Sequence, residues 1–355
     1  MPIPEDRPGH LAVTDRRSIR WPLGSVLVAI AVAAAFLAVP ALAAVPTRLV
    51  EGCAAWIATG GVLELLSALG FVVFFKLVFA APISWRRTTP AALRALGAST
   101  VLPGGPLIGG ATGAWSTSTE KPSFAQLARS TITFVILINA PEAMMLGVFG
   151  TLLWLGLPSG PHQTALTILP AVVAVGFLVA TWFARPTSRS HPPSRRRHWR
   201  FWRALAKPTE AVSTSITEVR ALVKAGNWKL VGALAYYAFD NAVLWAAFHA
   251  YGHAPQIGVV VMGYLVGSLA GALPIPAGLG VLEGGLIGAL VLYGAPAAPA
   301  AAAVLLYRGI SLSVPIALGV LGCARRPRSR ALRLNPRGAQ RSGAPELAAA
   351  RLDRS

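Results

Sequence analysis

The sequence predicts an all-α, polytopic helical membrane protein, and three observations support this fold class. Of its 355 residues, 54% are hydrophobic and 13% are charged, whereas a soluble domain carries about 25% charged residues. Apolar runs of about 20 residues, the length that a helix needs to cross a bilayer, recur along the chain. The net charge is nevertheless +19, so the charges must lie apart from the apolar runs. This combination excludes a simple soluble enzyme and a disordered basic tail protein.

Six apolar runs are long enough to be full membrane spans. They cover residues 22–44, 57–80, 130–156, 165–184, 228–251 and 298–322. The first run ends in Ala-Leu-Ala-Ala after a basic start, which also resembles a cleavable signal peptide, although it is long for one. Two further apolar stretches, 89–118 and 256–294, are interrupted by Pro and Gly. The sequence Asn139-Ala140-Pro141-Glu142 is expected to break the 130–156 span.

The positions of Lys and Arg predict which segments lie in the cytoplasm, because positive charge is retained on that side. The basic segments are residues 1–21, 83–97, 185–227 and 323–355, whereas the loops 157–164, 252–255 and 295–297 hold no Lys or Arg. Both chain termini are therefore expected in the cytoplasm. We divide the chain into a basic N-terminus (1–21), a transmembrane domain (22–322) and a basic tail (323–355) that is expected to be disordered.

This orientation constrains the two interrupted stretches. If 89–118 crossed the membrane once, the basic loop 185–227 would lie outside, so 89–118 is expected to be re-entrant or interfacial. The stretch 256–294 must return to the side that it left, either as two crossings or as one re-entrant hairpin. The charges leave both alternatives open, and the chain has either six full spans with two re-entrant segments or eight spans.

The two interrupted stretches share a motif. Leu102–Gly110 and Leu273–Gly285 each contain a Pro/Gly break, a short apolar step and a Gly pair, and each stands between two spans. With this orientation, the two span–break–span units cross the membrane in opposite directions. This predicts an inverted repeat of about 57–156 and 228–322. A broken helix leaves backbone N–H groups that must face a cavity or a ligand in the membrane, and a helix N-terminus suits phosphate. The candidate substrate-binding residues at the breaks are Pro103, Gly104, Gly105, Pro276, Gly278 and Gly280.

The glycines of these stretches also permit a simpler interpretation. Three sets are spaced four residues apart, the pattern of close helix–helix contacts: Gly105, Gly109 and Gly113; Gly263, Gly267 and Gly271; and Gly280, Gly284 and Gly288. Close packing and a substrate site are compatible, and we keep both.

Few ionisable residues fall inside apolar runs, where charges are costly and usually functional or paired. The acids are Glu64, Glu142, Asp240 and Glu283, and the bases are Lys76 and Arg308. Arg308 is expected to pair with Glu283 or Asp240, or to hold a lipid phosphate. Glu283, Asp240 and the adjacent Asn241 complete the candidate substrate site, in which the two acids position Arg308 or carry a coupling proton. Lys76 is expected to snorkel to the interface, and Glu64 has no assigned partner.

No motif for catalysis, metal or cofactor binding is found. Cys53 and Cys323 cannot form a disulfide framework, no Cys/His cluster indicates a metal, and the GxSxG, HExxH and P-loop motifs are missing. We therefore expect no enzymatic activity, no catalytic residue and no cofactor. Basic runs beside spans indicate orientation rather than a nucleic-acid partner. Residues 209–225 are expected to form a short amphipathic helix on the inner surface, with Thr209 as a possible cap.

The second half of the chain carries a recognisable set of motifs. They are Tyr236-Tyr237, Asp240 to Trp245, Gly263-Tyr264-Leu265, Pro274 to Gly285, Gly294-Ala295-Pro296 and Leu305 to Arg308. With these residues the chain resembles the lysylphosphatidylglycerol synthase transmembrane family of flippase-like integral membrane proteins, over about residues 57–322. Ala277 replaces a glycine usual in the family, and the first break lacks the family's Gly-Glu and Arg. Only 33 residues follow Gly322, too few for the soluble aminoacyl-transferase domain of the synthases, whose reaction is not expected here.

The resemblance implies a multi-pass protein of the bacterial cytoplasmic (inner) membrane that translocates lipids. We expect it to flip an anionic phospholipid or a polyprenyl-linked glycolipid, with the two breaks and Arg308 holding the phosphate. One alternative is a scaffold or accessory subunit that recruits a partner synthase or transferase. A membrane transferase is a weaker alternative, because no cluster of acids is found at one membrane face. The expected partners are anionic membrane lipids, and the oligomeric state stays open.

Overall fold

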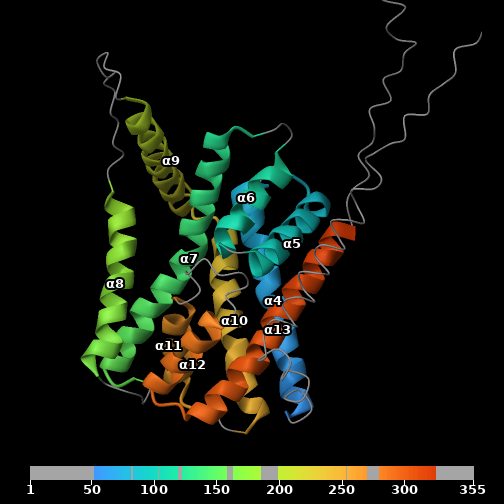
Figure 1. Cartoon of the computed structure of the whole chain (residues 1–355), viewed down its shortest axis with the longest axis vertical. Helices are drawn as coiled ribbons and strands as arrows, with labels where there is room; N and C mark the ends of the chain where they lie inside the picture. The colour runs from blue at the N-terminus through green and yellow to red at the C-terminus, as the bar shows by residue number, and fades with distance from the viewer. Residues whose placement is uncertain are drawn as a thin grey trace, which may run out of the picture. The chain divides into compact units, whose positions relative to one another are not determined.

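The computed structural model describes residues 52–80, 83–102, 104–118, 122–157, 163–184, 199–252, 254–269 and 280–324 (Figure 1). Side chains of residues 199–210 are not described. The predicted span 22–44, three of the predicted site residues (Pro103, Pro276 and Gly278) and nearly all of the basic tail lie outside the described residues. All secondary structure in the described part is helical. The prediction of an all-α protein is confirmed.

Five described helices are long and apolar enough to cross a membrane. They are α4 (Ala54–Phe79), α7 (Phe124–Trp154), α8 (Thr164–Phe183), α10 (Val231–Ala250, preceded by the 3-10 turn η1, Trp228–Leu230) and α13 (Ala297–Ala324). They coincide, within a few residues, with five of the six predicted spans. The prediction that α7 breaks was wrong: the helix continues through Pro141.

The two interrupted stretches form helical hairpins. The first consists of α5 (Trp85–Val101) and α6 (Gly105–Thr117), and the second of α11 (Ile257–Ser268) and α12 (Val281–Leu292). The arms are antiparallel in the second hairpin, where Gly263 faces Leu290 and Gly267 faces Leu286. At about 1.5 Å per residue these arms extend about 18 to 26 Å, less than the hydrocarbon core of about 30 Å. No single arm is therefore long enough to cross.

The antiparallel pair α4–α10 forms the centre of the helical bundle. The Cys53 N–H donates to the Ala250 carbonyl at 2.9 Å, which places the start of α4 beside the end of α10. Further along, the two backbones touch, because a Cβ atom on Gly70 would lie 2.7 Å from the Gly232 carbonyl oxygen. The Ser67 hydroxyl donates to the Tyr236 carbonyl at 2.9 Å in the same contact. The register between the two helices is fixed by this close approach.

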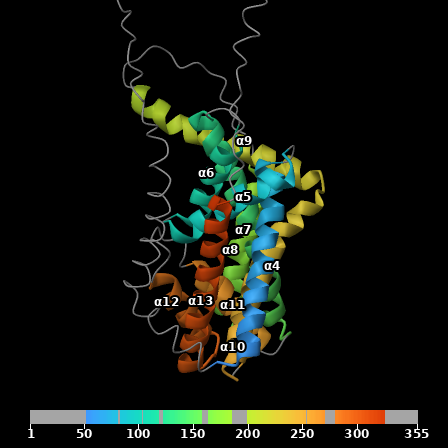
Figure 2. The same cartoon turned by 90° about the vertical axis from the view of Figure 1, so that its right-hand side faces the viewer.

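The hairpins approach this pair from opposite ends (Figures 1 and 2). The hairpin α5–α6 follows the end of α4 and packs against α13, with Gly97 on Gly319 and the Arg94 guanidinium donating to the Gly322 carbonyl at 3.0 Å. The hairpin α11–α12 follows the end of α10, which points the other way. Each half therefore has a long helix, a hairpin and a second long helix, in opposite directions. This order agrees with the predicted inverted repeat.

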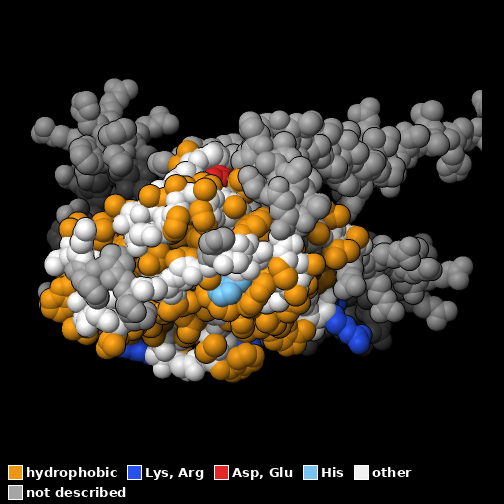
Figure 3. All heavy atoms as spheres, turned by 90° about the horizontal axis from the view of Figure 1, so that it is seen from below, with side chains coloured by type: hydrophobic (Ala, Val, Ile, Leu, Met, Phe, Trp, Pro, Cys, Tyr) orange, Lys and Arg blue, Asp and Glu red, His pale blue; other side chains and the backbone are white. Residues whose placement is uncertain are grey.

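The two ends of the helical bundle differ in charge. The connections α7–α8, α10–α11 and α12–α13 lie at the lower end in Figure 1, and no Lys or Arg occurs at residues 155–163, 251–256 or 293–296. Figure 3 views this end, where hydrophobic side chains cover much of the described surface. The basic start of α5, with Arg86 and Arg87, belongs to the opposite end. The charge asymmetry expected from the sequence is thus built into the bundle.

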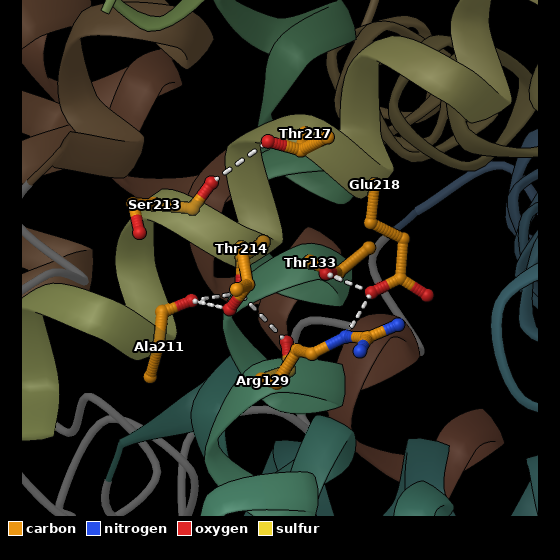
Figure 4. Close-up of polar contacts among 8 residues, drawn as sticks. Arg129, Thr133, Ala211, Ser213, Thr214, Thr217 and Glu218 are labelled. Atoms are coloured by element: carbon orange, nitrogen blue, oxygen red, sulfur yellow. Dashed lines mark hydrogen bonds and ion pairs between the residues drawn. The ribbon is translucent and has the colours of Figure 1, made fainter. Parts of the chain in front are cut away.

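The helix α9 (Trp199–Lys224) connects the two halves and packs on α7. The Arg129 guanidinium donates to Glu218 at 2.9 Å, and the Ser215 hydroxyl donates to the Arg129 carbonyl at 3.0 Å (Figure 4). The helix starts ten residues before the predicted 209–225 segment, because apolar residues continue upstream at helical spacing. Thr209 therefore lies inside the helix and is not a cap.

The glycines spaced four residues apart make close helix contacts in some helices and not in others. Gly109 and Gly113 of α6, like Gly263 and Gly267 of α11, make close helix contacts, but Gly284 and Gly288 of α12 have no described atom within 4 Å of a Cβ position.

The prediction that Lys76 snorkels was wrong. Its side chain is buried, and its ammonium donates to the carbonyls of Ala80 (3.2 Å) and Ile83. The turn from α4 into α5 presents these carbonyls at the negative end of the α4 dipole, where a cation is stabilised.

The Gly70–Gly232 contact predicts the effect of adding one methyl group to α4. Gly70→Ala places a carbon against backbone atoms that cannot move aside, so we expect a loss of about 1–3 kcal/mol in stability. Gly61→Ala is the matched control on the same helix, because a Cβ atom there meets nothing within 4 Å. Thermal unfolding of the detergent-solubilised protein, followed by circular dichroism, compares the two. Equal unfolding temperatures for both variants would contradict this packing.

Candidate functional site

Polar side chains gather in the middle of the bundle, between α4, α7, α10, α11, α12 and α13. They adjoin the start of α12, where the second break ends. We call this group the central polar cluster; its members are Glu64, Asn139, Glu142, Tyr237, Asp240, Asn241, Tyr264, Ser268, Glu283, Tyr307, Arg308 and Ser311. All lie on helices that are mainly apolar, so each polar group there depends on its neighbours rather than on solvent.

A buried ion pair joins α12 to α13. The Arg308 Nε donates to Glu283 Oε1 at 2.8 Å, and each side chain is only 7% exposed. The other Glu283 oxygen accepts the Gly280 N–H at 2.6 Å. Gly280 has a φ of +78°, a conformation that glycine adopts without strain, and it starts α12. Glu283 therefore connects the second break directly to Arg308. Of the two acids predicted to pair with Arg308, Glu283 is the one that forms the ion pair.

Asp240 joins the other helices of the cluster. Its Oδ2 accepts the hydroxyl groups of Tyr264 from α11 and Tyr307 from α13, the latter at 2.8 Å. Glu64 of α4 faces Asp240, because the antiparallel register of α4 and α10 places Gly60 against Val243 and Ser67 against Tyr236 on either side of this pair. Because Arg308 follows Tyr307 in α13, its charge also acts on Asp240. One carboxyl group thus connects four helices and both halves of the bundle.

The helix α7 contributes the remaining polar contacts. The Tyr237 hydroxyl donates to Asn139 Oδ1 at 2.9 Å, and the Asn139 amide donates to the Val135 carbonyl of its own helix at 2.7 Å. The Ser268 hydroxyl, at the end of α11, donates to Glu142. Glu142 therefore lies where the chain leaves α11 for the second break.

Three buried polar atoms of the cluster have no hydrogen-bond partner among the described residues. They are Glu64 Oε2, the Asn241 amide nitrogen and the Ser311 hydroxyl, on residues that are 3%, 4% and 9% exposed. Buried polar atoms are nearly always paired with protein, water or ligand. Within the described part of the bundle, these atoms therefore lack the partner that buried polar atoms normally have.

The first break has a different character. Gly104 and Gly105 have φ values of +98° and +42° and lead into α6, and no charged residue lies between Val101 and Thr117. Since α5 runs antiparallel to α13 with Gly97 on Gly319, its end points toward the middle of α13, where Arg308 lies. The second arm of the first hairpin, α6, starts just after this end of α5 and carries no side-chain charge.

The structure thus brings together most of the described predicted site residues. Gly280, Glu283 and Arg308 are joined by hydrogen bonds. Asp240 accepts from Tyr307, the neighbour of Arg308 in α13, and Asn241, which follows Asp240, is buried. The sequence did not predict a partner for Glu64, nor the hydrogen bonds of Tyr237, Tyr264 and Ser268. The available signal was the set of tyrosines in apolar spans, because a buried tyrosine hydroxyl usually needs a hydrogen-bond partner.

Comparison with known proteins identifies one family. The family described as "Lysylphosphatidylglycerol synthase TM region" matches residues 21–319. This range includes the whole of α4 to α12 and all of α13 except its end. No curated protein and no solved structure matches the chain.

The Arg308–Glu283 pair predicts a non-additive effect on stability. Arg308→Met leaves a buried carboxylate without its cation, and breaking one side of a buried pair costs about 3–5 kcal/mol. The double variant Glu283→Gln/Arg308→Met removes both charges and keeps an acceptor for Gly280, so we expect it to recover much of the loss. Thermal unfolding of the single and double variants measures this coupling.

The pair between Arg129 and Glu218 is the matched control. Its side chains are 52% and 31% exposed, and exposed pairs contribute about 0–1 kcal/mol, so Arg129→Met should change stability little. Identical losses in the single and double variants of the buried pair would refute the coupling.

Proposed function

The chain belongs to the lysylphosphatidylglycerol synthase transmembrane family, and from this membership we propose that it moves a phosphate-bearing lipid between the leaflets of the cytoplasmic membrane. The substrate is an anionic phospholipid or a polyprenyl-linked glycolipid, which share the phosphate ester. In this proposal the protein translocates the lipid and performs no catalytic step. It is a multi-pass membrane protein by family and by its five long apolar helices.

Arg308 carries the proposal. It is the one basic side chain of the central polar cluster within the described residues, and it is buried next to the start of α12. A guanidinium binds a phosphate through two parallel hydrogen bonds, and a helix N-terminus adds a partial positive charge for the same anion. Glu283 holds Arg308 in place between transport cycles. Asp240, Asn241 and Ser311 supply further polar groups around the head group.

The hairpins support a re-entrant topology. Their arms are too short to cross alone, and the arms of each pack against each other, so each hairpin enters and leaves on one side. We therefore favour six spans with two re-entrant hairpins over eight spans. In this arrangement the end with the α7–α8, α10–α11 and α12–α13 connections, which hold no Lys or Arg, faces outward, and both chain termini lie in the cytoplasm.

The surface of α8 suits a lipid environment. Large apolar side chains of this helix are widely exposed, among them Leu169 (61%), Val173 (64%) and Phe183 (72%). No helix of the described part of the chain covers these side chains, and in the proposal they face acyl chains in the membrane. The polar head group would travel through the cluster while the acyl chains remain in the bilayer.

Transport by reconstituted vesicles tests this function. Vesicles that contain the protein should move fluorescent phosphatidylglycerol between leaflets faster than empty vesicles. Arg308→Lys keeps the charge but loses the paired hydrogen bonds, and should slow movement about tenfold or more, as the loss of a charged hydrogen bond of about 1.5–3 kcal/mol implies. Arg129→Lys is the control and should transport normally. A lack of acceleration above empty vesicles for phospholipids and polyprenyl phosphates alike would rule out the proposed function.

A further inference from the structure

Two carboxyl groups from different halves of the bundle meet in the central polar cluster. Glu64 of α4 faces Asp240 of α10 in the antiparallel α4–α10 contact. Contacts on either side fix this register: Gly60 lies against Val243, and the Ser67 hydroxyl donates to the Tyr236 carbonyl at 2.9 Å. An ionised carboxylate only accepts hydrogen bonds, so two carboxyl groups in this arrangement need a proton between them. Two carboxyl groups so placed can share one proton.

The hydrogen bonds around the pair favour Glu64 as its protonated member. Asp240 accepts two tyrosine hydroxyls, from Tyr264 and Tyr307, and a donated hydrogen bond favours the anionic form of a carboxyl group. Glu64 is 3% exposed, and its Oε2 atom has no hydrogen-bond donor among the described residues. A neutral Glu64 donates to Asp240 and satisfies this geometry.

The other ionisable groups around the pair do not supply a competing cation. They are Glu142 from α7, Tyr236 and Tyr237 from α10, Tyr264 from α11, Glu283 from α12, and Tyr307 and Arg308 from α13. Arg308 is already held by Glu283. The helices α6 and α8 contain no ionisable residue, and Arg94 of α5 donates at the far end of α13, to Gly322. The acids thus outnumber the bases, and a proton is needed to limit the negative charge.

We propose that Glu64 and Asp240 form a proton-binding site whose occupancy is coupled to lipid movement, so that one proton crosses with each lipid phosphate. This inference rests on the proposed function and adds its energy source. The proton enters from the water on the side to which the cluster is open, binds the Glu64 carboxylate, and leaves to the water on the other side.

The coupling follows from the charges at the two sites. A phosphate on Arg308 competes with Glu283 and adds negative charge close to Asp240 in a medium of low dielectric. A proton on Glu64 reduces that repulsion, so phosphate and proton each strengthen the binding of the other. Tyr307 bonds to Asp240 and adjoins Arg308 in α13, so one helix connects the two sites.

The pair also lies at the boundary that transport must rearrange. Glu64 belongs to the first half and Asp240 to the second, on the antiparallel helices whose backbones touch at Gly70 and Gly232. Rocking of one half against the other would change the Glu64–Asp240 contact more than contacts within a half. Release of the proton can therefore accompany the change of access.

A pH gradient across reconstituted vesicles tests the coupling. The probe is fluorescent phosphatidylglycerol, and its distribution between leaflets is measured by accessibility to a membrane-impermeant quencher. With one proton per lipid, a gradient of one pH unit should shift the leaflet ratio by up to about tenfold toward the alkaline side. In Glu64→Gln the ratio should not respond to the gradient. Glu218→Gln, a matched change on α9 outside the cluster, should respond like the unchanged protein.

Infrared difference spectroscopy separates failure of this inference from failure of the proposed function. The carbonyl stretch of a protonated carboxyl group should be present in the unchanged protein, retained in Glu218→Gln and lost in Glu64→Gln, whether or not any lipid moves. Lipid movement with a leaflet ratio indifferent to the gradient would overturn the coupling and leave the proposed function standing. Persistence of the full band in Glu64→Gln would overturn the proton site itself. Size-exclusion profiles confirm that each variant is folded.

Discussion

A charge inside a membrane bundle must have a partner, and the Arg308–Glu283 pair is the contact on which the rest of the site depends. It joins α12 to α13 while both side chains are almost completely buried. Through its second oxygen, Glu283 also accepts the N–H of Gly280, at the point where the second break ends and α12 begins. One carboxylate thus satisfies a buried cation and an unpaired backbone donor, which are the two most costly groups to leave unpaired in hydrocarbon.

The α4–α10 contact provides the geometric counterpart of this electrostatic constraint. Two glycines allow the backbones to touch, and the antiparallel register that results brings Glu64 opposite Asp240. The same register sends the two hairpins to opposite ends of the bundle, because each hairpin follows the end of one of these helices. The inverted arrangement and the carboxyl pair therefore have one structural origin.

Local sequence properties predicted the parts that depend on local physics. Spans follow from apolar runs, and the breaks at Gly104 and Gly280 follow from Pro and Gly, so these predictions needed no tertiary information. The Arg308–Glu283 pair was accessible because few charges occur in the spans. The Glu64–Asp240 contact was not, since it depends on a register set by Gly70 and Gly232, far apart in sequence. The prediction that Lys76 snorkels was wrong for a related reason, because its hydrogen-bond partners come from the turn after α4 and not from the apolar run itself.

The predominance of carboxyl groups around a single guanidinium suits a site that must release what it binds. An arginine alone in a dry cluster would hold a phosphate too tightly to pass it on, whereas conduction through a membrane requires binding weak enough to permit exit. Glu283 competes with the phosphate for Arg308, and Asp240 adds repulsion from the neighbouring helix. A proton shared between Glu64 and Asp240 then adjusts that repulsion. The excess of acids thus supplies reversibility, which a set of matched ion pairs would not.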